Sequence, residues 1–468
     1  MYKKEELEMR GVEELRDIMR SFGGTPRLIN KKSLIENILL LQAGEKEPDR
    51  NNLGRKTRKE KDSLKDSQYP NDVINDIEIN EYEEDTPKYE YDEIQSGKVC
   101  GIMEFHEQGY AFLRGENYEA NLSTDVYVSK NAIKYFRLRR GDYVEGIAEK
   151  SKDNSSPSLK TVLKLNGKEY DQNAKRPYFD DLTPCYPDER ITLELDNKSE
   201  DISIRAIDIL SPIGKGQRGL IVAPPKAGKT TLLKKIAGSI EEKHKDIKLI
   251  VLLIDERPEE VTDFKRSVKS EVIYSTFDES PDHHIRAAEL VLNRAKRLVE
   301  DGEDVVVLLD SITKLTRAYN TLVPPSGKTL SGGIDPIALL APKKFFGAAR
   351  NIEKGGSLTI LSTALIETGS KMDDVIYEEF KGTGNMEIIL SRELSERRIF
   401  PAIDLYRSGT RREDLLLNEK EYEASYFIRR YLDRDLNASK NLIDMLKRTK
   451  SNSEFVEKAP VWCKMMSE

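Results

Sequence analysis

Residues 223–230, with the sequence APPKAGKT, constrain the fold of this chain more than any other stretch. They follow an apolar run at 220–222 and precede a segment of helical spacing at 231–236. A chain that reverses at a helix N-terminus directs free backbone N–H groups at one point, where the helix dipole also favours an anion. The stretch therefore predicts a phosphate-binding loop between a strand and a helix.

Two side chains of this loop have roles that follow from the mechanics of the motif. Lys229 is expected to reach the β- and γ-phosphates of a nucleotide, and the Thr230 hydroxyl is expected to help hold Mg²⁺. Ala223 stands where the first glycine of the usual pattern is expected. The alternative is a glycine-containing turn with no ligand, and the downstream motifs weigh against it.

From residue 211 onward, apolar runs alternate with helical stretches, which is typical of a largely parallel sheet covered on both faces. This pattern predicts an α/β fold of the P-loop NTPase type. The expected strands are 220–222, 249–254, 272–274, 305–309 and 358–361, with further strands at 387–390 and 399–405 and a helical cap over 411–445.

Two acidic residues follow neighbouring strands of this predicted sheet. Asp310 ends one apolar run, where such a sheet presents the carboxylate that holds Mg²⁺ through water. Glu256 follows the run 249–254, where a carboxylate can orient or deprotonate the attacking water. Helix capping or a surface loop would explain either residue alone. Their convergence with the phosphate loop on one sheet edge favours nucleotide hydrolysis.

Three further loops carry residues suited to phosphates. Arg411 lies in a short glycine-containing loop, from which an arginine can stabilise transition-state charge in its own site or a neighbouring subunit's. The loops 324–333 and 367–372 carry glycines, hydroxyls and a lysine, which suit a nucleic-acid backbone. A surface arginine and flexible surface lids are the alternatives.

Residues 98–167 contain five short β-rich runs separated by turns, which predicts a small barrel of the oligonucleotide-binding type. Tyr110 and Phe112 are spaced i, i+2, so both rings project from one face of a strand, and Tyr127 offers a third ring. Such rings form a stacking platform for unpaired bases. The alternative is that these aromatic residues fill the barrel core.

The remaining segments complete a predicted division into three domains, a linker and a connector. Residues 1–44 read as a helical module that serves packing or nucleic-acid contact, and residues 45–96 are too charged to offset the entropy of ordering and read as a disordered linker. The barrel covers 97–170, a proline-containing connector covers 171–210, and the ATPase domain with its C-terminal helices covers 211–468.

Length and composition limit the classes of protein to which the chain can belong. The chain has 468 residues, 38% of them hydrophobic, which is enough for about three domains. No apolar run is long enough for a membrane helix, and the N-terminus lacks the apolar segment of a signal peptide, so we expect a cytoplasmic protein that does not enter a membrane. Cys100, Cys185 and Cys463 are scattered and predict neither disulfides nor a structural metal. The net charge of −7 argues against a uniformly basic nucleic-acid binder but not against a local site.

With these motifs in place, the chain resembles the bacterial transcription termination factor Rho family, whose members are hexameric RecA-type RNA translocases. The resemblance covers residues 98–417, and the N-terminal helical module also fits. It is carried by the strings SPIGKGQRG at 211–219, LIDERPEEVT at 253–262 and EEFKGTGNM at 378–386, and Ala223 is the family's own form of the loop. Tyr110 departs mildly, since phenylalanine is more common there, and the charged insertion 44–96 is absent from the shortest members.

The resemblance implies a set of site residues. Those implied for catalysis are Glu256, Lys229, Arg411 and Arg398, with both arginines supplied by the adjacent subunit. Those implied for ATP binding are Gly214, Lys215, Gly216, Gln217, Arg218, Gly219, Lys226, Ala227, Gly228, Lys229, Thr230, Thr231, Arg257 and Phe400, the last against the adenine. Mg²⁺ is assigned to Thr230 and Asp310. The primary RNA site is implied to comprise Gln108, Gly109, Tyr110, Ala111, Phe112, Leu113, Arg114, Asp125, Val126 and Tyr127. The secondary RNA site is implied to comprise Lys328, Thr329, Leu330, Ser331, Gly332, Gly333 and Lys371.

The resemblance also implies the activity. We expect a homohexamer that binds cytosine-rich single-stranded RNA, hydrolyses ATP in an RNA-dependent manner, translocates 5′ to 3′ as a helicase and releases transcripts from RNA polymerase. The alternative is another ring-shaped RecA-type ATPase, of the rotary or protein-export type, whose turnover does not depend on RNA. An RNA-binding regulator whose nucleotide domain only switches conformation is a weaker alternative, because a switch does not need the water-activating Glu256.

Overall fold

The computed structural model of the chain divides into two compact units, residues 1–90 and 91–468. The structure describes residues 96–467, with gaps at 122–123, 151–155, 196–200, 405 and 432–435, and in the first unit only Leu15, Ile18, Ile35 and Ile38. These four residues are helical and buried. The rest of the predicted helical module and the predicted linker lie outside the described residues.

The first part of the larger unit is a closed barrel, as predicted. Its elements are β1 (Ser96–Phe105), β2 (Ala111–Arg114), η3 (Glu116–Tyr118), β3 (Val126–Val128), α4 (Lys130–Tyr135), β4 (Tyr143–Glu149), β5 (Ser158–Leu165) and β6 (Lys168–Glu169). The strands are ordered β3-β2-β1-β4-β5-β6, and an additional pairing of β3 with β5 closes the barrel. A short helix lies between β3 and β4, and the five predicted strands are all present.

Strand β2 decides between the two interpretations of the aromatic residues. Ala111 and Leu113 are buried in the barrel core, whereas Phe112 is half-buried on the opposite face of the strand. Successive side chains of a strand point to opposite faces, so small and aliphatic residues fill the interior and the rings lie outside. The interpretation in which the aromatic residues fill the core is therefore wrong.

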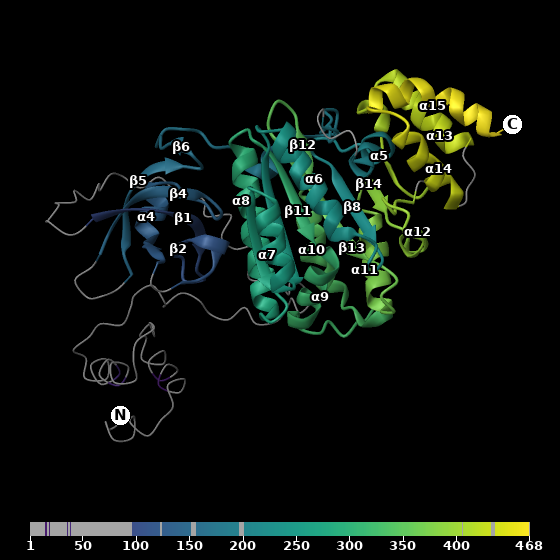
Figure 1. Ribbon diagram of the computed structural model, residues 1–468. Coiled ribbons are helices and arrows are strands. Elements are labelled where there is room, and N and C mark those ends of the chain that lie inside the picture. The colour runs from purple at the N-terminus through teal and green to yellow at the C-terminus, as the bar shows by residue number, and fades with distance from the viewer. Residues whose placement is uncertain are drawn as a thin grey trace, which may run out of the picture. The chain divides into compact units, whose positions relative to one another are not determined.

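A mixed sheet forms the centre of the ATPase domain (Figure 1). Its strands are β7 (Pro184–Cys185), β8 (Arg218–Ala223), β9 (Lys248–Glu256), β10 (Glu271–Thr276), β11 (Asp304–Asp310), β12 (Arg350–Ile352), β13 (Ser357–Leu365), β14 (Met386–Ile389) and β15 (Gly409–Thr410). The main path runs β10-β9-β11-β13-β8-β14-β15, and the first six of these strands are parallel.

Helices cover both faces of this sheet (Figure 1). The helices of the domain are α5 (Ile202–Leu210), α6 (Lys229–Lys243), α7 (Pro258–Ser267), α8 (Pro281–Glu300), α9 (Ile312–Leu322), α10 (Leu340–Gly347), α11 (Lys371–Lys381), α12 (Arg392–Glu396), α13 (Glu419–Tyr431), α14 (Leu436–Lys447) and α15 (Asn452–Ser467). The last three form a group beyond the sheet (Figure 1). The short 3₁₀ turns are η4 (Phe179–Asp181), η5 (Ser331–Gly333), η6 (Pro336–Leu339) and η7 (Glu413–Leu415).

The two helical layers create two hydrophobic cores. In β9, Val251 and Leu253 join the core that includes α5, α6 and α15, while Ile250 and Leu252 join the core that includes α8 and α9. A parallel strand buried on both faces reads as a continuous apolar run, which is why the sequence predicted these strands well.

Two predicted elements differ in the structure. Residues 399–405 do not form a strand in their described part, where Ile403 makes only an isolated bridge to Leu390. Pro401 has no N–H to donate, so it interrupts a strand ladder. In the connector, α5 is a buried helix that the sequence analysis did not predict. The C-terminal helices are present, but they extend from Glu419 to Ser467.

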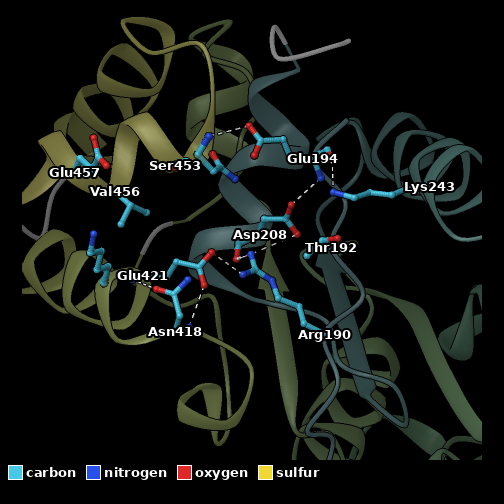
Figure 2. A pocket seen from close by; sticks show the side chains of 12 residues that line it. Arg190, Thr192, Glu194, Asp208, Lys243, Asn418, Glu421, Ser453, Val456 and Glu457 are labelled. Atoms are coloured by element: carbon cyan, nitrogen blue, oxygen red, sulfur yellow. Dashed lines mark hydrogen bonds and ion pairs between the residues drawn. The ribbon is translucent and has the colours of Figure 1, made fainter. Parts of the chain in front are cut away.

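Buried polar contacts tie the connector to α5. Asp208 of α5 is 2% exposed, and its carboxylate accepts hydrogen bonds from the backbone N–H groups of Leu193, at 2.9 and 3.0 Å, and Glu194, at 2.7 Å. Arg190 donates to the Asp208 carbonyl and to Glu421 of α13. A polar cavity of about 250 Å³ is lined by Arg190, Glu194, Asp208 and Glu421, and it also borders α6, α13 and α15 (Figure 2).

This network gives a stability prediction. Asp208→Ala should lower the free energy of unfolding by about 2–4 kcal/mol, because two buried N–H groups lose their acceptor. Thermal or urea unfolding measures the change, and Asp246→Ala, at an exposed position after α6, is the matched control. If the two variants have the same free energy of unfolding, the Asp208 carboxylate does not hold the connector in place.

Candidate nucleotide and RNA sites

Three predicted side chains meet at the carboxyl-terminal edge of the sheet. Lys229, the first residue of α6, places its Nζ 2.5 Å from Asp310 Oδ1 and 3.1 Å from Glu256 Oε1. The two carboxylates end the adjacent strands β11 and β9, and both are at most 5% exposed. Because parallel strands present their carboxyl ends at one edge, residues far apart in sequence converge here.

Burial and neighbouring charges set the protonation of this cluster. Burial, followed by the charge of Asp310, raises the pKa of Glu256, although Lys229 and Lys314 act in the opposite direction. Burial acts to lower the pKa of Lys229, but Asp310 and Glu256 outweigh it and raise that pKa. A lysine that stays charged next to a carboxylate of raised pKa suits a site that holds phosphates and accepts a proton from water.

Two members of the cluster were missed by the sequence analysis. Lys314, one turn after Asp310 in α9, donates to Glu256 Oε1 at 2.8 Å and to the Asp255 carbonyl at 2.5 Å. Thr363 of β13 donates to Asp310 Oδ1 at 2.7 Å. Two sequence signals could have revealed them. Lys314 lies one turn beyond an aspartate that ends a strand, and Thr363 places a hydroxyl within an apolar strand.

The phosphate loop has the backbone shape expected of it. Lys226 and Gly228 have φ values of 66° and 92°, and α6 begins directly after Gly228. A left-handed residue at this position lets the chain turn sharply into the helix, whose first N–H groups lack intrahelical partners. Of the loop's remaining predicted residues, Ala227 is buried, Thr230 is half-buried and Thr231 is exposed.

Other predicted nucleotide contacts lie around this loop. Ser395 of α12 donates to the Lys226 carbonyl at 3.1 Å, which places the segment after α12 beside the loop. Phe400 follows in that segment and is 48% exposed, so its ring is accessible to a base. Arg257, next to Glu256, is exposed at the start of α7.

One group of predicted residues does not join the phosphate loop within the chain. Gly214, Lys215, Gly216, Gln217, Arg218 and Gly219 lead into the amino-terminal end of β8, whereas the loop follows its carboxyl end. Lys215 pairs with Asp304, the first residue of β11, at 2.7 Å. Strand β8 holds the two segments about 16 Å apart within one chain. The assignment of residues 214–219 to an ATP site stays a prediction.

Arg411 lies at this same amino-terminal end. Its backbone N–H donates to the Asn385 carbonyl at 2.8 Å, and the Asn385 N–H donates to the Arg218 carbonyl at 3.0 Å. The Arg411 side chain is exposed, and within the described residues it forms no hydrogen bond or ion pair. It cannot reach the phosphate loop of its own chain.

Arg398 lies at the other end of the sheet from Arg411. It is exposed, with a φ of 59°, and it lies three residues after Ser395, on the edge that carries the phosphate loop. The structure therefore does not bring the two predicted arginines together within one chain.

The predicted RNA platform is an aromatic cluster on the barrel surface. The ring centroids of Tyr110, Phe112 and Tyr127 are 5.5–6.1 Å apart. His106 stacks on Tyr110 with centroids 4.5 Å apart, an addition that the sequence analysis missed. Gln108 and Gly109 form the turn before β2, where Gly109 has a φ of 83°. Half-buried rings on an open face suit stacking with bases.

The charged residues of the platform are held by ion pairs. Arg114 binds Glu104 at 2.5 Å and also Asp125, and its side chain is 12% exposed. Its guanidinium lies 4.7 Å from the Phe112 centroid. Asp125 and Val126 are buried, so Asp125 acts here as a partner of Arg114.

The predicted secondary-site loops lie side by side. Gly332 approaches the backbone at the start of α11 so closely that a Cβ would lie 2.7 Å from Met372 N. This contact brings the loop that contains Lys328, Thr329, Leu330, Ser331 and Gly333 next to Lys371. Both lysines are exposed, and neither forms an ion pair with another described residue.

Two further features concern only the part of the chain that the structure describes. None of the helices there is long and apolar enough to cross a membrane. In the same residues, no cluster of three or more histidine, cysteine or acidic side chains is placed to hold a metal ion.

Comparison with known proteins identifies both domains. The family described as "Rho termination factor, RNA-binding domain" matches residues 99–171, and the family described as "ATP synthase alpha/beta family, nucleotide-binding domain" matches residues 203–410. A solved structure from a study of an ATPase of the type III secretion system of pathogenic bacteria superposes with a TM-score of 0.50 at 23% identity. The superposition covers 67% of this chain and 95% of that one, and it shows a shared fold.

Curated relatives extend the match over both domains. The protein named transcription termination factor Rho from Cereibacter sphaeroides is 54% identical over 76% of this chain and 86% of its own length. The proteins of that name from Bacillus subtilis and Aquifex aeolicus are 54% and 53% identical over 76% and 77% of this chain, and over 83% and 84% of their own lengths. The chain belongs to the transcription termination factor Rho family.

Proposed function

We propose that this protein is an ATP-dependent transcription termination factor of the cytoplasm. It captures cytosine-rich single-stranded RNA on the barrel, hydrolyses ATP when RNA is bound, translocates 5′ to 3′ and releases the transcript from RNA polymerase. The observation that carries the proposal is the meeting of Lys229, Glu256 and Asp310 at one sheet edge of a chain that also bears an aromatic RNA platform.

The residues at the sheet edge have distinct roles in this proposal. The loop N–H groups and Lys229 bind the phosphates, and Glu256 orients the attacking water and accepts its proton. The Thr230 hydroxyl and the Asp310 carboxylate offer the oxygen donors that Mg²⁺ prefers, so they fit that ion. Bound there, Mg²⁺ would offset charge on the β- and γ-phosphates.

The second half of the site comes from a neighbouring subunit in this proposal. Arg411 and residues 214–219 lie at the amino-terminal end of β8, where they cannot serve their own phosphate loop. In a head-to-tail ring, one end of each subunit meets the opposite end of the next. A homohexamer of this kind lets Arg411 stabilise the transition-state charge of the adjacent site.

RNA contacts are divided between two surfaces in the proposal. Tyr110, Phe112 and Tyr127 stack with bases, and this stacking lets the barrel bind single-stranded RNA. The loop around Lys328 and the start of α11 at Lys371 offer exposed charge and close backbone for a phosphate chain. Movement of these loops with the nucleotide state would drive translocation.

The test is the steady-state ATPase rate with no nucleic acid, with cytosine-rich RNA and with duplex DNA. Stimulation by the RNA alone is expected. A rate that is indifferent to RNA would refute the termination function and would favour a rotary or export ATPase of the same fold.

The platform provides a matched pair of variants. Phe112→Ala should weaken RNA binding by about 5- to 100-fold, because stacking on one ring contributes about 1–3 kcal/mol per base. Tyr135→Ala removes another aromatic residue that is exposed on the same barrel, and it should bind RNA as the unmodified protein does. Fluorescence anisotropy with labelled oligo(C) measures both, and equal binding by both variants would exclude Phe112 from the RNA site.

A further inference from the structure

A buried carboxylate joins the barrel to the ATPase domain. Glu104, on β1, is 8% exposed and is shared by two arginines. Arg114 of the platform binds Glu104 Oε2 through Nε at 2.5 Å. Arg286, on α8 of the ATPase domain, binds Oε1 through Nε at 2.6 Å and Oε2 through Nη2 at 2.8 Å. The platform cation and an ATPase-domain cation therefore share one carboxylate, and both contact its Oε2 atom.

The charges of this group balance. Glu104 and Asp125 supply two negative charges, and Arg114 and Arg286 supply two positive ones. Burial acts to raise the pKa of Glu104, but the two arginines outweigh it, so the pKa is lowered and the carboxylate stays ionised at neutral pH. The four side chains together have no net charge, so a phosphate that approaches the rings is not repelled by them.

Arg286 itself does not face the bases. Its guanidinium is occupied by Glu104 and by the carbonyl of Tyr118, and its side chain is 26% exposed. Arg114, in contrast, lies 4.7 Å from the Phe112 centroid, at the edge of the stacking surface. Arg286 is therefore linked to the platform through Glu104, which Arg114 also contacts.

We propose that Arg286 is a positioning residue for the RNA platform: by binding Glu104 from the ATPase domain, it offsets the charge of the carboxylate that holds Arg114 beside Phe112. The proposal rests on the RNA-binding function proposed above. It gives helix α8 a role in RNA affinity that could not be inferred from the aromatic motif or from the phosphate loop.

The direction of the effect follows from the charges. Without Arg286, the group carries one net negative charge next to the platform, and Glu104 pairs with Arg114 alone. Both changes oppose the approach of a phosphate, the first by repulsion and the second by a tighter hold on the platform cation. Salt screens charges that lie near the surface, so the effect should shrink as ionic strength rises.

The experiment measures oligo(C) RNA binding by the full-length protein at low and high salt. Arg286→Ala should raise Kd about three- to tenfold at low salt and by less at high salt. Arg286→Lys keeps the charge and should recover most of the affinity. The RNA concentration that gives half-maximal ATPase stimulation should rise by the same factor as Kd.

The matched control is Arg294→Ala. Arg294 also lies on α8 and also contacts the barrel, donating to Asn166 Oδ1 at 2.7 Å, but it does not touch Glu104. Its replacement should change Kd by less than about twofold. If both alanine variants weaken RNA binding equally, domain docking in general explains the effect and the proposal is wrong.

The remaining outcomes are also decisive. Unchanged RNA binding by folded Arg286→Ala would overturn the proposal and leave the proposed function intact. Failure of the unmodified protein to bind oligo(C) would overturn the proposed function itself. If Arg286→Ala does not fold, Arg286→Gln replaces it, and this variant must bind RNA more weakly than Arg286→Lys for the proposal to stand.

Discussion

Glu256→Gln should lower the RNA-stimulated ATPase rate by about 10³-fold, because the amide cannot accept a proton from the attacking water. ATP binding should persist, since glutamine has the same size and keeps an oxygen for Lys314, which donates to Glu256 at 2.8 Å in the structure. Steady-state hydrolysis and the binding of a fluorescent ATP analogue separate the two effects.

Glu259→Gln is the control for this variant. Glu259 lies three residues later in α7 and is exposed, so its replacement should leave hydrolysis unchanged. A Glu256→Gln protein that hydrolyses ATP within about tenfold of the normal rate would exclude Glu256 as the base, since loss of a positioned base costs about 10²–10⁴-fold.

Arg411→Ala should lower hydrolysis by about 10³-fold or more, which is the usual loss for an arginine that stabilises phosphoryl-transfer charge. Because Arg411 and the phosphate loop lie at opposite ends of β8, the loss should be repairable by a second subunit. Mixing Arg411→Ala subunits with Lys229→Ala subunits tests this directly, since each variant alone lacks one half of every site.

In mixed rings, about one interface in four should combine an intact phosphate loop with an intact arginine, because each half-site is intact in half of the subunits. Activity should therefore return on mixing. If Arg411 served its own subunit, mixing would restore nothing, and the interfacial assignment would fall. Arg412→Ala, which removes an exposed arginine paired with Asp414, is the control and should remain active.

The sequence predicted the convergence of Lys229, Glu256 and Asp310 because each residue belongs to an element that is recognisable locally. Lys229 follows directly from the loop, and Glu256 and Asp310 end apolar strands that were recognisable as such. Parallel strands carry their ends to a common edge, so the convergence of the three side chains could be predicted without coordinates.

Other features depend on topology that a local pattern does not contain. Residues 214–219 are close to the phosphate loop in sequence, but a whole strand separates them in space. Helix α5 ends a proline-containing connector, and its burial depends on contacts with the distant α13 and α14. The ion pair between Arg286 and Glu104 joins residues 182 positions apart, so the charge next to the aromatic cluster could not be inferred from the cluster's own sequence.

The contact between the barrel and strand β10 has a consequence for solubility. β10 is the last strand on one side of the main sheet, and the Asn117 side chain accepts from its Tyr274 N–H at 2.8 Å and donates to the Tyr274 carbonyl at 3.0 Å. The amide thus occupies backbone groups that would otherwise be open to pairing with another chain. Exposed sheet edges promote aggregation. A fragment that lacked the barrel is therefore expected to expose these two backbone groups of β10 and to self-associate more readily than the full chain.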